Sequence, residues 1–263
     1  MKAILFDLDG VLYNDEQPIP GAADAIRWIE SRKIPHLFVT NTSTRGPEAL
    51  VQKLARFGIP AGPEQILTPS VAAAAWLRVH ATGPVALFVQ PPARPVFEGI
   101  PLVPESAETG AKYVVVGDLE ESWNFHTLNR AFRLLHSDPE AVIIALGMTR
   151  FWRANDGLRL DVAPFVALLE CASARKAVVF GKPAAAFYEA ATETLGVEKT
   201  EVLMIGDDIE VDVGGAQRAG LLGALVKTGK FRPSSLEGGI RPDAVLDSVA
   251  DLPRLWETQA AAR

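Results

Sequence analysis

Short apolar runs alternate with amphipathic stretches along most of this chain, and this alternation limits the folds that it can adopt. The run at residues 2–6 is continuously apolar after its lysine, which indicates a strand buried on both faces of a sheet. Strands that alternate with helices form a parallel sheet with helices on both faces. We therefore predict an α/β fold whose core is a Rossmann-like, doubly wound parallel sheet.

The two ends of the chain and its middle each carry this alternation. For the ends we predict further strands at 36–39, 177–180, 202–205 and 222–226, and helices at 22–33, 47–57, 70–79 and 184–195. For the middle we predict strands at 85–89, 113–116 and 142–146, and helices at 124–135 and 164–172. Turn-rich stretches flank the middle. The predicted domains are a core from residues 1–78 and 176–263 and a smaller inserted α/β domain at 79–175.

The composition excludes several classes of partner and location. A net charge of −6 leaves no overall basic surface for nucleic acid. No apolar stretch approaches the ~20 residues of a membrane span, and acidic residues come too early for a secretory signal. Cys171 is the only cysteine, which excludes an internal disulfide, and we expect it to be a small buried apolar residue. We therefore expect a cytoplasmic protein that binds neither nucleic acid nor membranes.

Four short polar segments each follow a predicted strand directly. They are DLDG at 7–10, TNTS at 40–43, GKP at 181–183 and GDD at 206–208. In an open parallel sheet, the carboxyl ends of the strands form the crevice where ligands bind. This shared position predicts that the four segments build one site.

The first segment places two carboxylates close together. Asp7 and Asp9 are two residues apart, so in an extended backbone they face the same side. Two carboxylates on one side repel each other unless a cation or a shared proton compensates them. Carboxylate oxygen suits Mg²⁺, which binds one or two carboxylates together with substrate oxygens and water. The pattern therefore indicates a magnesium site.

Two of the other segments supply further carboxylates and hydrogen-bond donors. Asp207 is predicted to be a metal ligand, and Asp212 lies one helical turn after Asp208. For Asp208 two interpretations stay open, support of the metal and capping of the following helix. Thr40 and Asn41 offer donors to phosphoryl oxygens, or alternatively a capping turn before the next helix.

Lys182, between glycine and proline, offers a charge that can neutralise a carboxylate and a transferring phosphoryl group. The alternative is an ordinary solvated lysine on a loop. The cation that the other three segments call for favours the first interpretation.

In this order the four segments resemble the four motifs of the haloacid dehalogenase superfamily. In this chain DLDGVL matches the DxDG(T/V) form of the first motif, and GDDIEVD matches the GDxxxxD form of the last. The resemblance implies that Asp7 is the nucleophile, forming an aspartyl-phosphate, and that Asp9 is the general acid and base. It implies that Thr40, Asn41 and Lys182 bind the phosphoryl group.

The same resemblance implies a ligand set for Mg²⁺. The metal would be held by Asp7, the backbone carbonyl of Asp9 and Asp207. Asp208 or Asp212 would support these ligands from behind.

The position of the insertion resembles subfamily IIA of this superfamily, whose members carry an α/β cap between the second and third motifs. Stretches such as VLYNDEQPIPGA, FVTNTSTR and VGGAQRAGLLGALVKTGKF carry this resemblance over nearly the whole chain. Several relatives have serine where this chain has Asp9, so its acid implies ordinary phosphomonoesterase activity. The alternatives are a phosphatase for phosphohistidine, phospholysine or pyrophosphate, and a non-enzymatic member that binds phospholigands. Dehalogenation needs neither Mg²⁺ nor a second aspartate, which argues against it.

The inserted domain offers candidates for contact with the leaving group. Arg150, Trp152, Arg153 and Asn155 would give a cationic and stacking surface, although Trp152 packed in the core of the insertion is the favoured interpretation. Asp118 after the strand at 113–116 is similarly ambiguous. We expect small phosphorylated metabolites as substrates, because a cap restricts access to the site. A homodimer is one alternative for the assembly.

Overall fold

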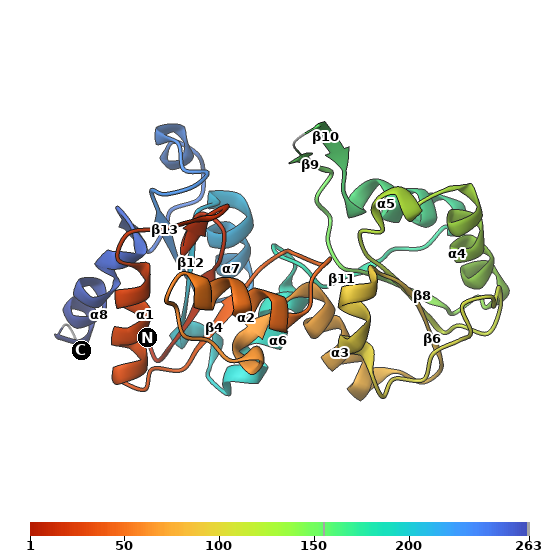
Figure 1. The fold of residues 1–263 in the computed structure, drawn as a ribbon, viewed down its shortest axis with the longest axis horizontal. Helices are drawn as coiled ribbons and strands as arrows, with labels where there is room; N and C mark the ends of the chain where they lie inside the picture. The colour runs from red at the N-terminus through yellow and green to blue at the C-terminus, as the bar shows by residue number, and fades with distance from the viewer. Residues whose placement is uncertain (155, 262–263) are drawn as a thin grey trace. The chain divides into compact units, whose positions relative to one another are not determined.

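The computed structural model describes residues 1–154 and 156–261 of the chain (Figure 1). The packing of Cα atoms divides it into two compact units. The first unit comprises Met1–Thr40, Pro47–Leu67 and Lys182–Arg263, and the second comprises Asn41–Gly46 and Thr68–Gly181. The division therefore falls at residues other than the predicted domain limits, and it assigns the helix after residue 68 to the second unit.

The first unit is built on a six-stranded sheet with the order β14-β13-β12-β1-β4-β5. All neighbouring pairs are parallel. The strands are β1 (Ala3–Asp7), β4 (His36–Val39), β5 (Ile66–Leu67), β12 (Val202–Gly206), β13 (Leu222–Val226) and β14 (Ala244–Leu246). The chain order reverses at β1, since β4 follows on one side and β12 lies on the other. Such a switch point is where an open parallel sheet forms its ligand crevice.

Both faces of this sheet are covered because β1 is apolar on both sides. All five of its residues are buried, which confirms the predicted strand. Ile4 and Phe6 pack into one core together with residues from three helices, α1 (Ala22–Ser31), α2 (Pro47–Arg56) and α8 (Leu252–Ala261). On the other side, α6 (Ala185–Leu195) contacts β4 and α7 (Gly215–Arg218) contacts β13. The predicted α/β class is correct.

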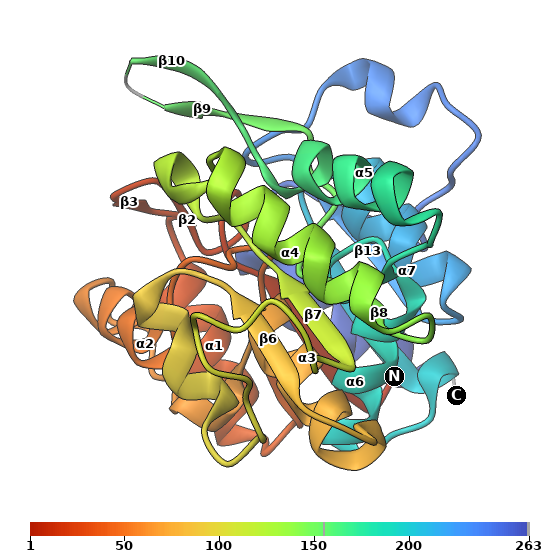
Figure 2. The ribbon, with the colours of Figure 1, turned by 90° about the vertical axis from the view of Figure 1, so that its right-hand side faces the viewer.

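The second unit has its own parallel sheet, with the order β11-β8-β7-β6. Its strands are β6 (Val85–Phe88), β7 (Tyr113–Val116), β8 (Val142–Ala145) and β11 (Val178–Val179). Figure 2 shows α4 (Phe125–Ser137) and α5 (Val162–Ser173) lying across one face, where their apolar residues share a core with β7 and β8. The helix α3 (Pro69–His80) also belongs to this unit.

The strand at 178–179 corrects one prediction. We expected this run in the first sheet, but β11 pairs with β8, Val178 opposite Ile144 and Val179 opposite Ala145. The connection from β8 through α5 to β11 is short, and elements that follow one another in the chain usually become neighbours. Apolarity alone predicts a strand without telling which sheet it joins.

Two hairpins stand beside the sheets and were not predicted as such. Tyr13–Asn14 (β2) pairs with Gln17–Pro18 (β3), and Phe151–Ala154 (β9) pairs with Gly157–Leu160 (β10), both antiparallel. Trp152 on β9 is 38% exposed, so its predicted burial in the core is wrong. A two-stranded hairpin has no second layer to cover such a side chain.

Cys171 is exposed, contrary to the expectation of burial. The buried residues of α5 are Val162, Ala163, Val166 and Leu169, a stripe with helical spacing. Cys171 follows Leu169 by two residues and therefore points away from that stripe. Among the described residues, no helix is long and apolar enough to cross a membrane.

Candidate active site

The site lies at the carboxyl ends of β1, β4 and β12 in the first unit. Asp7 ends β1 and is in register with Val39, the last residue of β4. On the other side, Phe6 is in register with Ile205, so Asp207 follows its strand close to Asp7. The predicted meeting of these carboxylates at one sheet edge is seen in the structure.

Lys182 joins two buried carboxylates. Its Nζ lies 2.7 Å from Asp7 Oδ1 and 2.7 Å from Asp212 Oδ1. All three residues are buried, with 5% of Lys182, 8% of Asp7 and 1% of Asp212 exposed. An ammonium group in this position compensates charges that would otherwise be costly to bury. The predicted approach of Lys182 to Asp7 is therefore seen, although its strand belongs to the other sheet.

Asp207 is enclosed by two loops that leave no room for side chains. Gly10 has φ +84° and Gly229 has φ +65°, and a Cβ on either would lie 2.1 Å from Asp207 Oδ2. The same oxygen accepts a hydrogen bond of 2.7 Å from the Lys230 amide. Asp207 Oδ1 is buried and accepts no hydrogen bond from any residue that the structure describes. A buried carboxylate oxygen of this kind calls for a partner such as a cation.

Asp212 comes from a π-helical turn at Ile209–Gly214. A Cβ on Gly206 would lie 2.2 Å from Asp212 Cβ, so glycine permits this close approach. The Asp208 amide donates to Asp212 Oδ2 at 3.1 Å, and the Tyr188 hydroxyl donates to the Asp212 carbonyl at 3.1 Å. These contacts fix the Asp212 carboxylate beside Asp7, and the predicted support of the metal ligands by Asp212 stays a prediction.

Asp208 caps the turn that follows it. Its Oδ1 accepts hydrogen bonds of 3.0 Å from the Glu210 and Val211 amides. Its Oδ2 lies 3.5 Å from Lys230 Nζ. Of the two interpretations left open for Asp208, the geometry favours capping.

Three carboxylates and one ammonium group leave this cluster with two uncompensated negative charges. One oxygen each from Asp7, Asp207 and Asp212 lie within 4.8 Å of one another. A hard divalent cation takes such oxygen ligands and balances a charge of this size. Together with the unpartnered oxygen of Asp207, the donor set fits a bound divalent cation.

The pKa values of these groups reflect first their burial and then the neighbouring charges. Burial raises the pKa of Asp7 to about 7, with Lys182 acting against it and Asp212 adding to it. Burial also raises the pKa of Asp207 to about 6, opposed by the hydrogen bond from the Lys230 amide. Burial alone would lower the pKa of Lys182, but the carboxylates of Asp212 and Asp7 together raise it. Without a cation, protons therefore compete for these carboxylates near neutral pH.

Asp9 is exposed, unlike Asp7, because the extended backbone ends at Asp7 and the chain turns before the β2–β3 hairpin. Its Oδ1 accepts a long hydrogen bond of 3.5 Å from the Asp15 amide. An accessible carboxyl group beside a buried one can exchange protons with a substrate. The predicted part of its backbone carbonyl in metal binding stays a prediction.

Thr40 and Asn41 fall on opposite sides of the division into units. Thr40 is buried directly after β4, and its amide donates to the Leu67 carbonyl at 3.2 Å. Asn41 belongs to the second unit. Phosphate binding by both residues stays a prediction.

Sequence reasoning missed several residues that shape the site, among them Tyr188, Gly229 and Lys230. Tyr188 stands in an otherwise apolar stretch of α6, and its hydroxyl donates to two backbone carbonyls of the turn, Val211 at 2.9 Å and Asp212 at 3.1 Å. Gly229 and Lys230 stand in TGK after a strand, a fifth polar segment of the kind already used. Their position after β13 was the one available signal.

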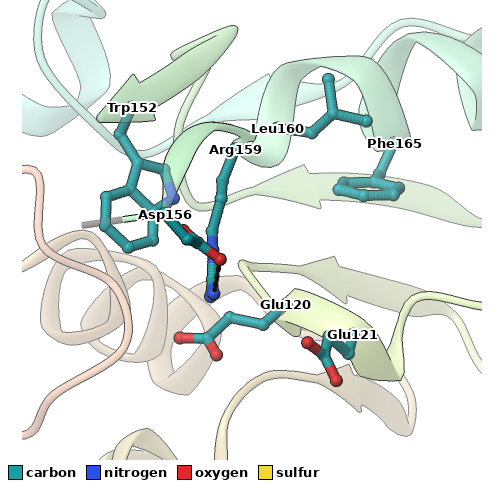
Figure 3. A pocket seen from close by; sticks show the side chains of 7 residues that line it. All are labelled: Glu120, Glu121, Trp152, Asp156, Arg159, Leu160 and Phe165. Atoms are coloured by element: carbon teal, nitrogen blue, oxygen red, sulfur yellow. Dashed lines mark hydrogen bonds and ion pairs between the residues drawn. The ribbon is translucent and has the colours of Figure 1, made fainter. Parts of the chain in front are cut away.

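The second unit contains a cavity of about 320 Å³ beside the β9–β10 hairpin (Figure 3). Its lining residues are Glu120, Glu121, Trp152, Asp156, Arg159, Leu160 and Phe165. Arg159 pairs with Asp156 through two hydrogen bonds, of 3.1 and 2.7 Å, so its charge is already compensated. Trp152 thus lines a cavity, and its contact with the leaving group stays a prediction. Asn155 lies outside the described residues, and a ligand-binding role for Arg150 and Arg153 stays a prediction.

Asp118, the other ambiguous residue of the insertion, has a structural task. Its carboxylate is buried and accepts a hydrogen bond of 2.8 Å from the Glu120 amide. This contact fixes the turn after β7, where Glu120 has a φ of +48°.

Comparisons with known proteins agree with this geometry. A family model described as haloacid dehalogenase-like hydrolase matches residues 4–101, and one described as HAD-hydrolase-like matches residues 179–252. The haloacid dehalogenase-like hydrolase domain-containing protein 2 of Homo sapiens is 38% identical, over 90% of this chain and 88% of that protein. The human phospholysine phosphohistidine inorganic pyrophosphate phosphatase is 34% identical, over 95% of this chain and 92% of that protein.

Among solved structures, the p-nitrophenyl phosphatase from Archaeoglobus fulgidus superposes with a TM-score of 0.86 at 27% identity. The match covers 97% of this chain and 98% of that one. Both units of the chain therefore have counterparts in one known protein.

Proposed function

This chain belongs to the haloacid dehalogenase-like hydrolase family, and from that membership we propose that it is a Mg²⁺-dependent phosphatase for small phosphorylated metabolites. The observation that carries the proposal is the buried cluster of Asp7, Asp207 and Asp212, two of which pair with Lys182. Its excess negative charge and its unpartnered oxygen suit a divalent cation. The name of the p-nitrophenyl phosphatase supports a phosphate ester as the substrate.

In the proposed reaction Asp7 is the nucleophile and Asp9 moves the proton. A carboxylate oxygen of Asp7 attacks phosphorus, the bond from phosphorus to the leaving oxygen breaks, and that oxygen takes the proton of Asp9. A water molecule then attacks phosphorus and gives its proton to Asp9, and the bond to Asp7 breaks to release inorganic phosphate. The second step returns the proton to Asp9 and frees Asp7, so the full cycle regenerates both groups.

The remaining residues of the cluster prepare Asp7 for this attack. Lys182, 2.7 Å from Asp7, favours the ionised form of that carboxylate and adds positive charge next to the entering phosphoryl group. Thr40 and Asn41 would donate hydrogen bonds to the phosphoryl oxygens. Asp7, Asp207 and Asp212 would hold Mg²⁺ with the carbonyl of Asp9, and the metal would supply charge neutralisation between two anions.

A second candidate is a phosphatase for phosphohistidine, phospholysine or pyrophosphate. It is supported by the name of the human relative that is 34% identical to this chain. The presence of both Asp7 and Asp9 in the sequence argues against a non-enzymatic phospholigand-binding role. We also propose a cytoplasmic location, and we leave a homodimer as an alternative that sedimentation of the purified protein would decide.

The central test is hydrolysis of p-nitrophenyl phosphate with Mg²⁺ and with a chelator. We expect turnover only with the metal, and a loss of at least about a thousandfold in Asp7→Asn, because that change removes the nucleophile. Asp24→Asn is the matched control, since it removes a carboxylate that is exposed on α1. Metal-independent turnover, or an active Asp7→Asn variant, would refute the proposal.

The substrate class needs a separate measurement. A panel of small phosphate esters, pyrophosphate, phosphohistidine and phosphoproteins should show the highest kcat/KM for a small ester. A preference for pyrophosphate or phosphohistidine would select the second candidate. A preference for phosphoproteins would contradict both.

A further inference from the structure

The hairpin that follows Asp7 is held by α2 from outside the site. Tyr13, the first residue of β2, is buried, and its ring packs against Phe57 with centroids 5.4 Å apart. The Lys53 ammonium lies 4.2 Å from the centre of the Tyr13 ring and 3.6 Å from Glu16 Oε1. Arg56 approaches the same carboxylate at 3.3 Å. We refer to these five residues as the hairpin latch.

Lys53 is the central residue of the latch because its charge is shielded from water. Its side chain is 12% exposed, whereas that of Arg56 is 63% exposed. A shielded ammonium needs compensation, and a ring face together with a carboxylate supplies it. The exposed pair of Arg56 with Glu16 adds little, since water screens it. The position of the hairpin on α2 therefore depends chiefly on Lys53 and Tyr13, and Glu16, whose side chain is 57% exposed, contributes less.

The same hairpin contacts the backbone at Asp9 and Gly10. The Gly10 amide donates to the Tyr13 carbonyl at 2.7 Å, and Asp9 forms an isolated bridge with Tyr13. The Asp15 amide at the hairpin turn reaches the Asp9 carboxylate. Contacts thus run without a break from Lys53 through the hairpin to Asp9, all within the first unit.

We propose that the hairpin latch positions Asp9 for proton transfer to the leaving group. This inference rests on the proposed function, in which the leaving oxygen takes the proton of Asp9 as its bond to phosphorus breaks. Lys53, Tyr13 and Glu16 are positioning residues, since they act through Asp9. Their effect must therefore depend on how much the leaving group needs a proton.

The leaving group provides the test. An alkyl phosphate leaves as a strongly basic alkoxide unless it is protonated, whereas p-nitrophenolate leaves readily without a proton. We expect Lys53→Met to lower kcat/KM for an alkyl phosphate about tenfold and that for p-nitrophenyl phosphate by less than about twofold. Asp9→Asn should also lower kcat/KM more for the alkyl phosphate than for p-nitrophenyl phosphate, and by a larger factor than Lys53→Met does. In the Asp9→Asn background, Lys53→Met should add no further loss that is specific to the alkyl ester.

Two variants separate positioning from general loss of structure. Lys53→Arg keeps a cation over the ring. It should therefore keep the ratio of kcat/KM for the two esters close to the wild-type value. Arg32→Met removes a similar contact elsewhere, since Arg32 lies 4.4 Å from the Trp28 ring centre and 3.1 Å from Glu257. That variant should leave the ratio unchanged. If Lys53→Met does not fold, Glu16→Gln tests the same latch at an exposed residue.

If Lys53→Met lowered kcat/KM equally for both esters, or for neither, the proposed role of the hairpin latch in positioning Asp9 would be wrong. Failure of the proposed function looks different, because wild type would then hydrolyse neither ester or Asp7→Asn would stay active. Thermal unfolding of each variant shows that the compared proteins are folded.

Discussion

At the scale of single residues, Lys182 and its two carboxylates depend on one another. The lysine reaches Asp7 and Asp212 at 2.7 Å in a buried environment, and both carboxylates lose their compensation when it is removed. The unpartnered oxygen of Asp207 beside them marks where a cation belongs. Neither the lysine nor the acids are stable there without the others.

Lys182→Met should destabilise the metal-free protein by about 3 kcal/mol at about pH 8, because two buried carboxylates are left unpaired. The loss should shrink at about pH 5. The pKa of Asp7 is already raised to about 7 and rises further without the lysine, so the folded protein takes up a proton there. Urea unfolding at both pH values measures this.

The matched control is Lys199→Met, which breaks an exposed pair with Glu189. It should cost less than about 1 kcal/mol at either pH. The same large loss for Lys182→Met at both pH values would contradict the predicted proton uptake.

At the scale of elements, the site is made by loops that approach one another closely after β1, β12 and β13. Gly10 after β1 and Gly229 after β13 surround the carboxylate of Asp207, which follows β12. The hydroxyl of Thr228 also donates to the Gly10 carbonyl, which ties two of the loops together. Parallel neighbours bring these loops to one edge, and glycine lets them meet.

Gly229→Ala should weaken Mg²⁺ binding at least about tenfold, because its Cβ would displace the Asp207 carboxylate that lies 2.1 Å from the Cβ position. Gly58→Ala is the matched control, with a similar φ of +70° and nothing within 4 Å of the added Cβ. Both changes cost about 1 kcal/mol of backbone strain. Calorimetric titration with Mg²⁺ would contradict the expectation if both variants bound equally well.

At the scale of the whole molecule, two separate cores support two parallel sheets, and the carboxylate cluster belongs to the first. Asp7, Asp207 and Asp212 all come from the unit built on the six-stranded sheet. We therefore expect the stability of that unit to depend on both protons and metal.

The stabilisation of the protein by Mg²⁺ should grow as the pH rises from about 5 to about 8. Burial raises the pKa of Asp7 to about 7 and that of Asp207 to about 6, so the folded protein holds more protons than the unfolded chain at acidic pH. The metal-free protein consequently loses stability as the pH rises through this range. Mg²⁺ replaces those protons, so its affinity increases as they leave.

Thermal unfolding with and without Mg²⁺ at each pH measures this linkage. The shift in Tm should be small at about pH 5 and largest at about pH 8. A shift that is independent of pH would show that neither carboxylate exchanges a proton for the metal.

The sequence by itself determined the α/β class, the positions of most strands and helices, and the candidate carboxylates Asp7 and Asp207. These depend on local patterns, since a buried strand is continuously apolar and its carboxyl end faces the crevice. The site residues Gly229 and Tyr188 were missed because their roles come from contacts with distant parts of the chain.

Only the tertiary structure decided which sheet each strand joins and which acids meet. It assigned β11 to the second sheet, brought Asp212 beside Asp7, and left Asp208 as a cap. It also placed Lys53 of α2 over the ring of Tyr13, in the hairpin that follows Asp9. Local spacing sets what a segment can form, whereas the partners of a buried charge are set by packing between segments that the sequence keeps far apart.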